Sequence, residues 1–318
     1  MTTYLIRRLV MLVIVLLIVS ILVFLAMRLL PGDPIRMLVT QSESQEFTEE
    51  QIAKLKHEFG LDKPLPVQYV NWIGGIFHGD LGTSILHRAP VAQEIIRRLP
   101  ITLHVGLTAF VIGLIIGIPF GVICAVRRGT FIDTFVTTMS NLGITVPVFW
   151  LGVLLIYAFG LYLRWLPVMG YTSPFENLGM SAKQLIMPVA CMCLFPIASM
   201  TRQTRSSMLE VMRQDYIRTA WSKGLKERVI IIRHALKNGL IPVITLSGMG
   251  LSMIIGGTVI IETVFNIPGM GRLAVTSVLN QDYPYVQGII LIVSTFVMLV
   301  NLLVDLTYGW LDPRIRFS

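Results

Sequence analysis

Residues 215–238 read DYIRTAWSKGLKERVIIIRHALKN, and this charged stretch separates two strongly apolar blocks. Its first part has the spacing of a short amphipathic helix over about 215–224, with Asp215 as N-cap or first-turn acid and Gly224 allowing a turn. The apolar positions recur at i, i+3, i+4, i+7 and i+8, which is one helix face: Ile217, Ala220, Trp221, Gly224 and Leu225. The spacing leaves three roles open, which are a lipid-bound helix, a solvated connector, and a helix that fills a groove on a cytosolic partner.

The blocks around this stretch give the chain a membrane composition. Of the 318 residues 54% are hydrophobic and 14% charged, and the mean hydropathy is +0.73, whereas soluble domains carry roughly a quarter charged residues. Six runs are long enough to cross a bilayer as helices of about 20 residues: 9–27, 101–126, 134–163, 184–201, 239–261 and 285–304. The sequence therefore predicts an all-α polytopic membrane protein with six transmembrane helices, the first of them retained and not cleaved as a signal peptide.

The distribution of Lys and Arg predicts the orientation. If the N-terminus is inside, 15 of the 26 basic residues fall on inside segments, nine of them in the loop 202–239. Cytoplasmic loops carry this excess of positive charge, so both termini are expected in the cytoplasm. The net charge of +8 is then a topological signal and does not indicate nucleic-acid binding.

Four segments follow from these spans. Residues 1–30 form the N-terminal tail and first helix, 31–99 an extracytoplasmic insertion, 100–306 the core with the remaining five helices and the loop 202–239, and 307–318 a cytoplasmic tail. The insertion contains a predicted helix of the soluble type. It begins with the capping-box pattern Thr48-Glu49-Glu50-Gln51 and stops at Gly60.

The run 134–163 is too long for one span and contains Pro147, which kinks a helix. In membranes such breaks occur where they pack within protein or line a cavity. Together with 184–201 and the glycine-rich 239–261, this run is expected to form the pathway core, with tight helix contacts alone as the alternative. Pro147, Phe149 and Trp150 are the candidates here.

No pattern in the sequence indicates catalysis or a metal site. Cys124, Cys191 and Cys193 all lie in apolar runs, which is typical of small buried side chains. The dipeptide His57-Glu58 lacks the second histidine of a zinc-protease motif, and the chain has no phosphate-binding G-x-x-x-x-G-K-[ST] loop. We expect a non-catalytic protein that binds no cofactor and no metal itself.

Ten short stretches together resemble the permease subunits of ABC importers, specifically the B-type permeases of the dipeptide, oligopeptide and nickel branch. Two of them, RTAWSKGL at 218–225 and RHALKN at 233–238 followed by Pro242, resemble the cytosolic "EAA" loop of these proteins. The others are YLIRRL at 4–9, LPGDP at 30–34, FGLDKP at 59–64, GDLGTS at 79–84, VPVFWLG at 146–152, IETVFNIPGMGRL at 261–273, QDYP at 281–284 and DLTYGWLDPRIR at 305–316. The loop departs from the broad EAA pattern, because only Ala220 and Gly224 match it and Trp221 stands where this branch often has a basic residue.

The resemblance implies a type I importer permease fold in the inner membrane and a set of partner proteins. These are a paralogous second permease, two cytosolic ATPase subunits that carry ATP and Mg²⁺, and an extracytoplasmic substrate-binding protein, with membrane lipid around the spans. The 31–99 segment would be a scoop that meets the binding protein. The loop helix would be a coupling helix seated on an ATPase through Asp215, Ile217, Arg218, Ala220, Trp221, Gly224 and Leu225.

The resemblance predicts a peptide importer, with nickel complexes, glutathione or oligosaccharides as alternative substrates. A self-contained secondary transporter is the competing class, and it would take up solute without ATPase partners. Glu262 and Arg272 lie at the expected outer mouth. We hypothesise that one of them meets a charged end of the substrate there.

Overall fold

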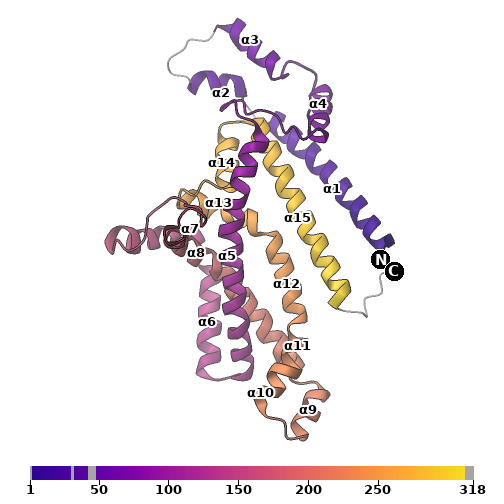
Figure 1. The fold of residues 1–318 in the computed structure, drawn as a ribbon, viewed down its shortest axis with the longest axis vertical. Helices are drawn as coiled ribbons and strands as arrows, with labels where there is room; N and C mark the ends of the chain where they lie inside the picture. The colour runs from indigo at the N-terminus through magenta and orange to yellow at the C-terminus, as the bar shows by residue number, and fades with distance from the viewer. Residues whose placement is uncertain (1, 30–31, 42–47, 312–318) are drawn as a thin grey trace. The chain divides into compact units, whose positions relative to one another are not determined.

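A computed structural model describes residues 2–29, 32–41 and 48–311, and all the named elements in these ranges are helices (Figure 1). The chain divides into two compact units. The first contains the described residues of Met1–Thr102 and Pro268–Met298, and the second those of Leu103–Ile267 and Leu299–Phe317. Of the predicted tail 307–318, the last seven residues lie outside the described residues.

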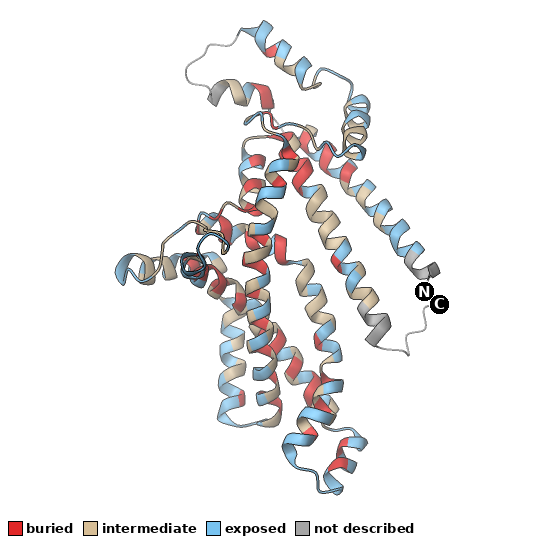
Figure 2. Ribbon diagram, viewed as in Figure 1, coloured by how far each residue is buried: buried red, intermediate tan, exposed pale blue. Residues whose placement is uncertain are grey.

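The first unit is built from five helices and parts of two more. They are α1 (Thr2–Leu29), α2 (Pro34–Gln41), α3 (Glu49–Glu58), α4 (Leu65–Phe77), α14 (Met270–Leu279), the beginning of α5 (Val91–Val126) and the beginning of α15 (Tyr283–Leu311). Figure 2 shows that α1 buries residues mainly in its last turns, where Ser20, Val23, Phe24 and Met27 are buried. The preceding residues 6–19 are exposed or half-buried, as expected for an apolar helix that meets lipid.

Helix α3 confirms the predicted capping box. The Thr48 hydroxyl accepts a hydrogen bond from the Gln51 amide at 3.4 Å, and the Gln51 side chain accepts one from the Thr48 amide at 2.9 Å. Each contact satisfies a backbone donor that a helix start otherwise leaves open. Gly60 has a φ of +65°, which is the left-handed stop that its position after the helix predicts.

The first unit is held together by two apolar clusters and one buried carboxylate. One cluster joins α1, α2 and α3 to the start of α15, and the other joins α5, α14 and α15. Asp282, which is 2% exposed, accepts hydrogen bonds from the Ser84 hydroxyl at 2.5 Å and from the Ile85 amide at 3.2 Å. These bonds fix the loop after α4 to the start of α15.

The second unit contains the ten remaining helical elements, the rest of α5 and the end of α15. They are α6 (Phe131–Thr145), α7 (Val148–Leu155), the π-helix η1 (Ile156–Tyr162), α8 (Leu178–Val211), α9 (Asp215–Ser222), α10 (Glu227–Val229), the π-helix η2 (Ile230–Ala235), α11 (Leu236–Gly239), α12 (Ile241–Ser252) and α13 (Ile254–Val264).

Helices α5 and α8 approach each other through glycines. A methyl group on Gly117 would lie 2.7 Å from the Ile197 carbonyl oxygen, and one on Gly121 would lie 2.5 Å from Thr204 Cβ. At the same seam the Thr201 hydroxyl donates to the Gly117 carbonyl at 3.2 Å. Only glycine allows two backbones to come this close in a membrane helix pair.

The described helices include four that are long and apolar enough to cross a membrane, and six if each of two bent pairs counts as one span. The four are Ile6–Leu29, Val91–Val126, Leu178–Val211 and Tyr283–Leu306. The bent pairs are Phe131–Thr145 with Val148–Tyr162, at 97°, and Glu227–Gly239 with Ile241–Ser252, at 49°. The break in the first pair is at Pro147, as the sequence predicts, because proline cannot donate the hydrogen bond that would continue α6.

Two boundaries differ from the sequence prediction. The run 239–261 is not one helix, because α12 ends at Ser252 and α13 begins at Ile254. The predicted boundary between 99 and 100 lies inside α5, which starts at Val91 and continues through Pro100. A proline weakens a helix interior but does not always end it.

Candidate functional site

Helix α9 and the segments that hold it form the candidate site, which lies in the second unit. Figure 1 shows α9 and α10 at the end of this unit where the α5–α6 connection also lies. One apolar cluster joins them, because Ile217 and Ala220 of α9 pack with Ala125 of α5, Met208 of α8 and Ile230 of η2. The helix therefore rests on three other elements of its own chain.

The local sequence explains where α9 begins and ends. Asp215 occupies the first turn, where a negative charge is favourable next to the free amide groups. Gly224 has a φ of +73°, which a residue with a side chain rarely adopts. Its amide donates to the Trp221 carbonyl at 2.9 Å, and this bond closes the last turn.

One part of the predicted apolar face of α9 is buried within the chain, and the other part is exposed. Ile217 is 0% exposed and Ala220 is 6% exposed, whereas Trp221 and Leu225 are 47% and 36% exposed. In this conformation the side chains of Ile217 and Ala220 fill the cluster of their own chain, and their predicted contact with an ATPase stays a prediction. Helical periodicity identifies an apolar face but does not say what covers it.

The large exposed side chains of α9 are Tyr216, Arg218 and Trp221. Asp215 lies at the start of the helix, and Gly224 and Leu225 follow its end at Ser222. Arg218 Nη1 lies 3.5 Å from Asp215 Oδ1, but both side chains are more than 70% exposed, so this pair contributes little stability. Tyr216 was missed by the sequence reasoning. Its hydroxyl accepts a hydrogen bond from the Asn238 side chain at 2.9 Å, which connects the exposed face to α11.

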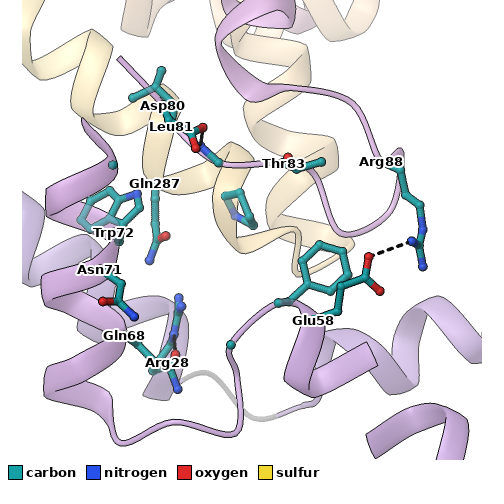
Figure 3. A pocket seen from close by; sticks show the side chains of 15 residues that line it. Arg28, Glu58, Gln68, Asn71, Trp72, Asp80, Leu81, Thr83, Arg88 and Gln287 are labelled. Atoms are coloured by element: carbon teal, nitrogen blue, oxygen red, sulfur yellow. Dashed lines mark hydrogen bonds and ion pairs between the residues drawn. The ribbon is translucent and has the colours of Figure 1, made fainter. Parts of the chain in front are cut away.

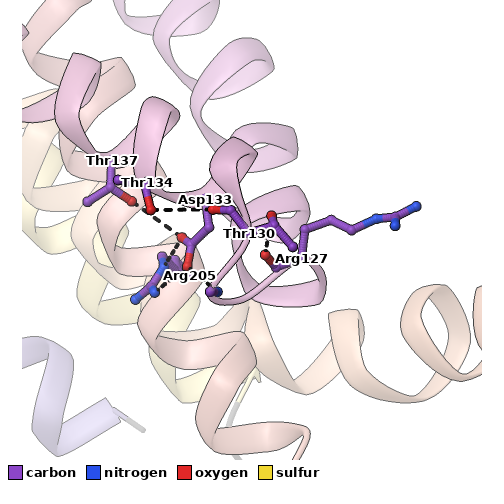
Figure 4. A network of polar contacts seen from close by, with 7 residues as sticks. Arg127, Thr130, Asp133, Thr134, Thr137 and Arg205 are labelled. Atoms are coloured by element: carbon purple, nitrogen blue, oxygen red, sulfur yellow. Dashed lines mark hydrogen bonds and ion pairs between the residues drawn. The ribbon is translucent and has the colours of Figure 1, made fainter.

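An ion pair with a buried carboxylate joins α6 to α8 (Figure 4). Asp133 of α6 is 5% exposed and accepts two hydrogen bonds from the Arg205 guanidinium of α8, at 2.7 and 2.8 Å. The Gly129 amide donates to the same carboxylate at 3.0 Å. Paired hydrogen bonds of this kind have a defined geometry, so α8 is oriented against the α5–α6 connection.

Two family profiles match this chain. A family profile described as "Binding-protein-dependent transport system inner membrane component" matches residues 117–317, and a profile for the N-terminal part of such membrane components matches residues 1–106. The chain belongs to this family of inner membrane transport components.

Curated relatives match this permease over its full length. It is 41% identical to the "Probable peptide ABC transporter permease protein y4tP" of Sinorhizobium fredii, with 100% of both chains covered. It is 39% identical to the "Oligopeptide transport system permease protein AppB" of Bacillus subtilis, again over 100% of both chains. It is 37% identical to the "Dipeptide transport system permease protein DppB" of Escherichia coli, over 99% of each.

A solved structure supports the importer fold. The chain resembles a chain of the inward-facing MetNI methionine ABC transporter with a TM-score of 0.54, covering 69% of this chain and 96% of that one. The sequence identity of 16% limits this likeness to the fold. The permease is thus a multi-pass inner membrane protein with the ABC importer permease fold, as the sequence predicts.

Among the pathway candidates, Pro147 lies at a cavity and the other two do not. A cavity of about 290 Å³ lies at the break between α6 and α7 and is also lined by Cys191, Leu194 and Phe195 of α8. Phe149 and Trp150 do not line it and are 52% and 51% exposed.

The two residues predicted at the outer mouth differ in exposure. Glu262 of α13 is 0% exposed, and its meeting with a charged end of the substrate stays a prediction. Its place near the end of an apolar run gave no indication of this burial. Arg272 of α14 is half-buried, and its meeting with substrate stays a prediction.

Proposed function

We propose that this permease is one of two membrane subunits of an ATP-driven importer of di- or oligopeptides. The observation that carries this proposal is the full-length similarity to proteins named as peptide, oligopeptide and dipeptide permeases, at 41%, 39% and 37% identity. The partners are a paralogous permease, two cytosolic ATPase subunits and an extracytoplasmic binding protein. ATP and Mg²⁺ belong to the ATPases, and this subunit is non-catalytic.

Helix α9 is the coupling helix in this proposal. Its exposed Trp221, Tyr216 and Leu225 enter a cleft on one ATPase, since large aromatic side chains are the usual anchors of protein interfaces. Its buried Ile217 and Ala220 pass the movement of that ATPase to α5, α8 and η2. When the ATPases close on ATP, the two coupling helices of the transporter move together and the pathway opens outward.

The orientation follows the distribution of basic residues. The loop 202–239 and both termini lie in the cytoplasm, and the segment 31–99 lies outside, where it contacts the binding protein. Arg127 and Arg128 of the α5–α6 connection support this orientation, because they belong to the end of the second unit that also carries α9 (Figure 1). Both loops are basic and share one side, as the positive-inside rule requires.

Capture of the ATPases and peptide uptake test the proposal. The tagged permease is co-expressed with its partner subunits, and the ATPases that co-purify in mild detergent are quantified. Trp221→Ala is expected to lower capture at least about tenfold, the effect of losing an interface anchor. Trp165→Ala removes an equally large side chain that is 67% exposed elsewhere in the second unit, and it should leave capture unchanged.

Transport in proteoliposomes separates the importer from a secondary transporter. Uptake of labelled dialanine should require the ATPases, the binding protein and ATP, and Trp221→Ala should abolish most of it. Uptake by the permease alone, driven by a proton or sodium gradient, would refute the importer. Normal ATP-dependent uptake by Trp221→Ala would refute the assignment of α9.

A further inference from the structure

The first unit contains a cavity of about 630 Å³ that the transport proposal does not use (Figure 3). Its wall is formed by the end of α1, by α3 and α4, by the loop around Asp80–Thr83 and by the start of α15. Ligand pockets for small molecules commonly have volumes of about 300–1,000 Å³. The cavity is therefore large enough for a molecule the size of a dipeptide.

Three hydrogen-bond donors on this wall are buried without a hydrogen-bond partner among the described residues. They are Arg28 Nη1, Trp72 Nε1 and Gln287 Nε2. Figure 3 shows the side chains of these three residues around one opening. A buried donor that makes no hydrogen bond costs about 1–3 kcal/mol, so three of them at one cavity indicate a missing acceptor group.

Two arginines and two acids line the cavity, and they differ in whether they are paired. Arg28 has no carboxylate partner in the described part of the chain, since its Nε donates to the neutral Gln68 Oε1 at 3.2 Å and its guanidinium lies over the rings of Phe24 and Tyr283. The two acids that line the cavity are already engaged. Glu58 accepts from Arg88 at 3.2 Å, and Asp80 accepts from the Gly82 amide at 2.8 Å.

We propose that this cavity binds the carboxylate of a small polar solute. The carboxylate accepts hydrogen bonds from Arg28, Trp72 and Gln287, because a guanidinium and further N–H groups are the strongest recognition set for this anion. The amide side chain of Asn71 on the same wall is placed to meet an amide group of the solute, whereas the Gln68 amide already bonds to Arg28, Leu61 and Lys63. That this solute is a short peptide rests on the proposed function, whereas the carboxylate chemistry rests on the cavity alone.

Fluorine NMR on the intact transporter measures this binding directly. The complex of permease and partner subunits is labelled with 5-fluorotryptophan and placed in lipid nanodiscs without binding protein or ATP. The resonance of Trp72 is assigned from its loss in Trp72→Phe. Dialanine should shift this resonance saturably, and dialanine amide, which lacks the carboxylate, should bind at least about tenfold more weakly.

Two variants test the wall donors. Arg28→Gln and Gln287→Met should each weaken dialanine binding at least about tenfold. The second variant keeps the length of a side chain that is 2% exposed, and it provides a result if Arg28→Gln does not fold. Arg36→Gln is the matched control, since it removes one positive charge from a side chain of the same unit that is 66% exposed and outside the cavity.

Three outcomes would overturn the proposal: equal binding of dialanine and its amide, unchanged binding by both wall variants, or a Trp72 shift that only the binding protein produces. These outcomes are independent of transport. If uptake depends on ATP but dialanine does not shift the Trp72 resonance, the carboxylate site in the cavity is refuted and the importer proposal stands. Binding at Trp72 without ATP-dependent uptake would refute the importer and keep the carboxylate site.

Discussion

Arg205 holds Asp133 through both of its carboxylate oxygens, at 2.7 and 2.8 Å. The two residues are 72 positions apart and join α8 to the start of α6. Asp133 is almost fully buried, whereas the Arg205 side chain keeps 30% of its exposure. The carboxylate is therefore the partner that cannot lose its counter-charge without leaving a buried ion.

Arg205→Ala should destabilise the permease by about 2–4 kcal/mol, because it leaves the Asp133 carboxylate buried without a cation. Because Arg205 is partly exposed, this destabilisation is expected near the lower end of the range for breaking buried ion pairs. Thermal unfolding in detergent measures the change. Arg202→Ala, on an exposed position of the same helix, should stay within about 0.5 kcal/mol of the parent. Equal stability of the two variants would contradict the role of the pair.

Gly121→Ala should destabilise the second unit by about 1–3 kcal/mol, because the added methyl group meets Thr204 Cβ at 2.5 Å and the Thr201 carbonyl at 2.6 Å. Gly257→Ala adds the same group where no atom lies within 4 Å, and it should be neutral or stabilising by up to about 1 kcal/mol through helix propensity. Unfolding temperatures of the two variants give the comparison. A Gly121→Ala protein as stable as Gly257→Ala would exclude a close α5–α8 seam.

Ile217→Ala should loosen α9 from its own chain, because it opens a cavity at a side chain that is 0% exposed. Such truncations cost about 2–5 kcal/mol. Hydrogen exchange of the α9 amides should then become faster. Trp221→Ala should leave this exchange unchanged, since half of Trp221 is already in contact with solvent. If both variants exchanged alike, the division of the α9 face into a docked and a free side would be incorrect.

The stability of the first unit should fall in acid through Asp33. Burial raises the pKa of this carboxyl, but the Lys56 ammonium at 2.5 Å and the amides of Ile35 and Arg36 more than compensate, and the net pKa lies below 3.8. A folded-state pKa below the unfolded value gives stabilisation that is fully present above about pH 3.8 and is lost as the pH falls through the folded pKa.

Unfolding temperatures between pH 7 and pH 3 measure this dependence. Lys56→Met should reduce the loss on acidification, since it removes the cation that lowers the pKa of Asp33. Lys54→Met removes a cation from the same helix whose side chain is 76% exposed and pairs with Glu50. It should follow the pH profile of the parent, and a profile altered as much as that of Lys56→Met would argue against the Asp33 contact.

The features that the sequence predicts well are those with local causes. The capping box at Thr48, the stop at Gly60, the break at Pro147 and the turn at Gly224 each depend on a few neighbouring residues, and each is present in the structure. The apolar runs are equally local, because bilayer thickness sets their length.

The features that the sequence does not predict depend on contacts between distant segments. The burial of Ile217 requires Met208 and Ile230, and the complete burial of Glu262 depends on neighbours that a single run of residues does not specify. The start of α5 at Val91 extends the helix beyond its apolar run, because Val91 and Ile95 join the cluster formed with α14 and α15. Hydrophobic periodicity predicts which face of a helix is apolar and how long an apolar run is. Contacts with distant segments decide whether that face is buried and where the helix begins.

The glycine seam between α5 and α8 has a mechanical consequence. Glycines 113, 117 and 121 of α5 are in close contact with α8. Sliding one helix along the other would break these contacts on three successive turns at once. The two helices are therefore expected to move as one rigid body during the transport cycle. The hinges are then expected at the breaks between helices, at Pro147, at the 49° bend between Gly239 and Ile241, and at Met253. A crosslink that locks α5 to α8 should leave transport intact.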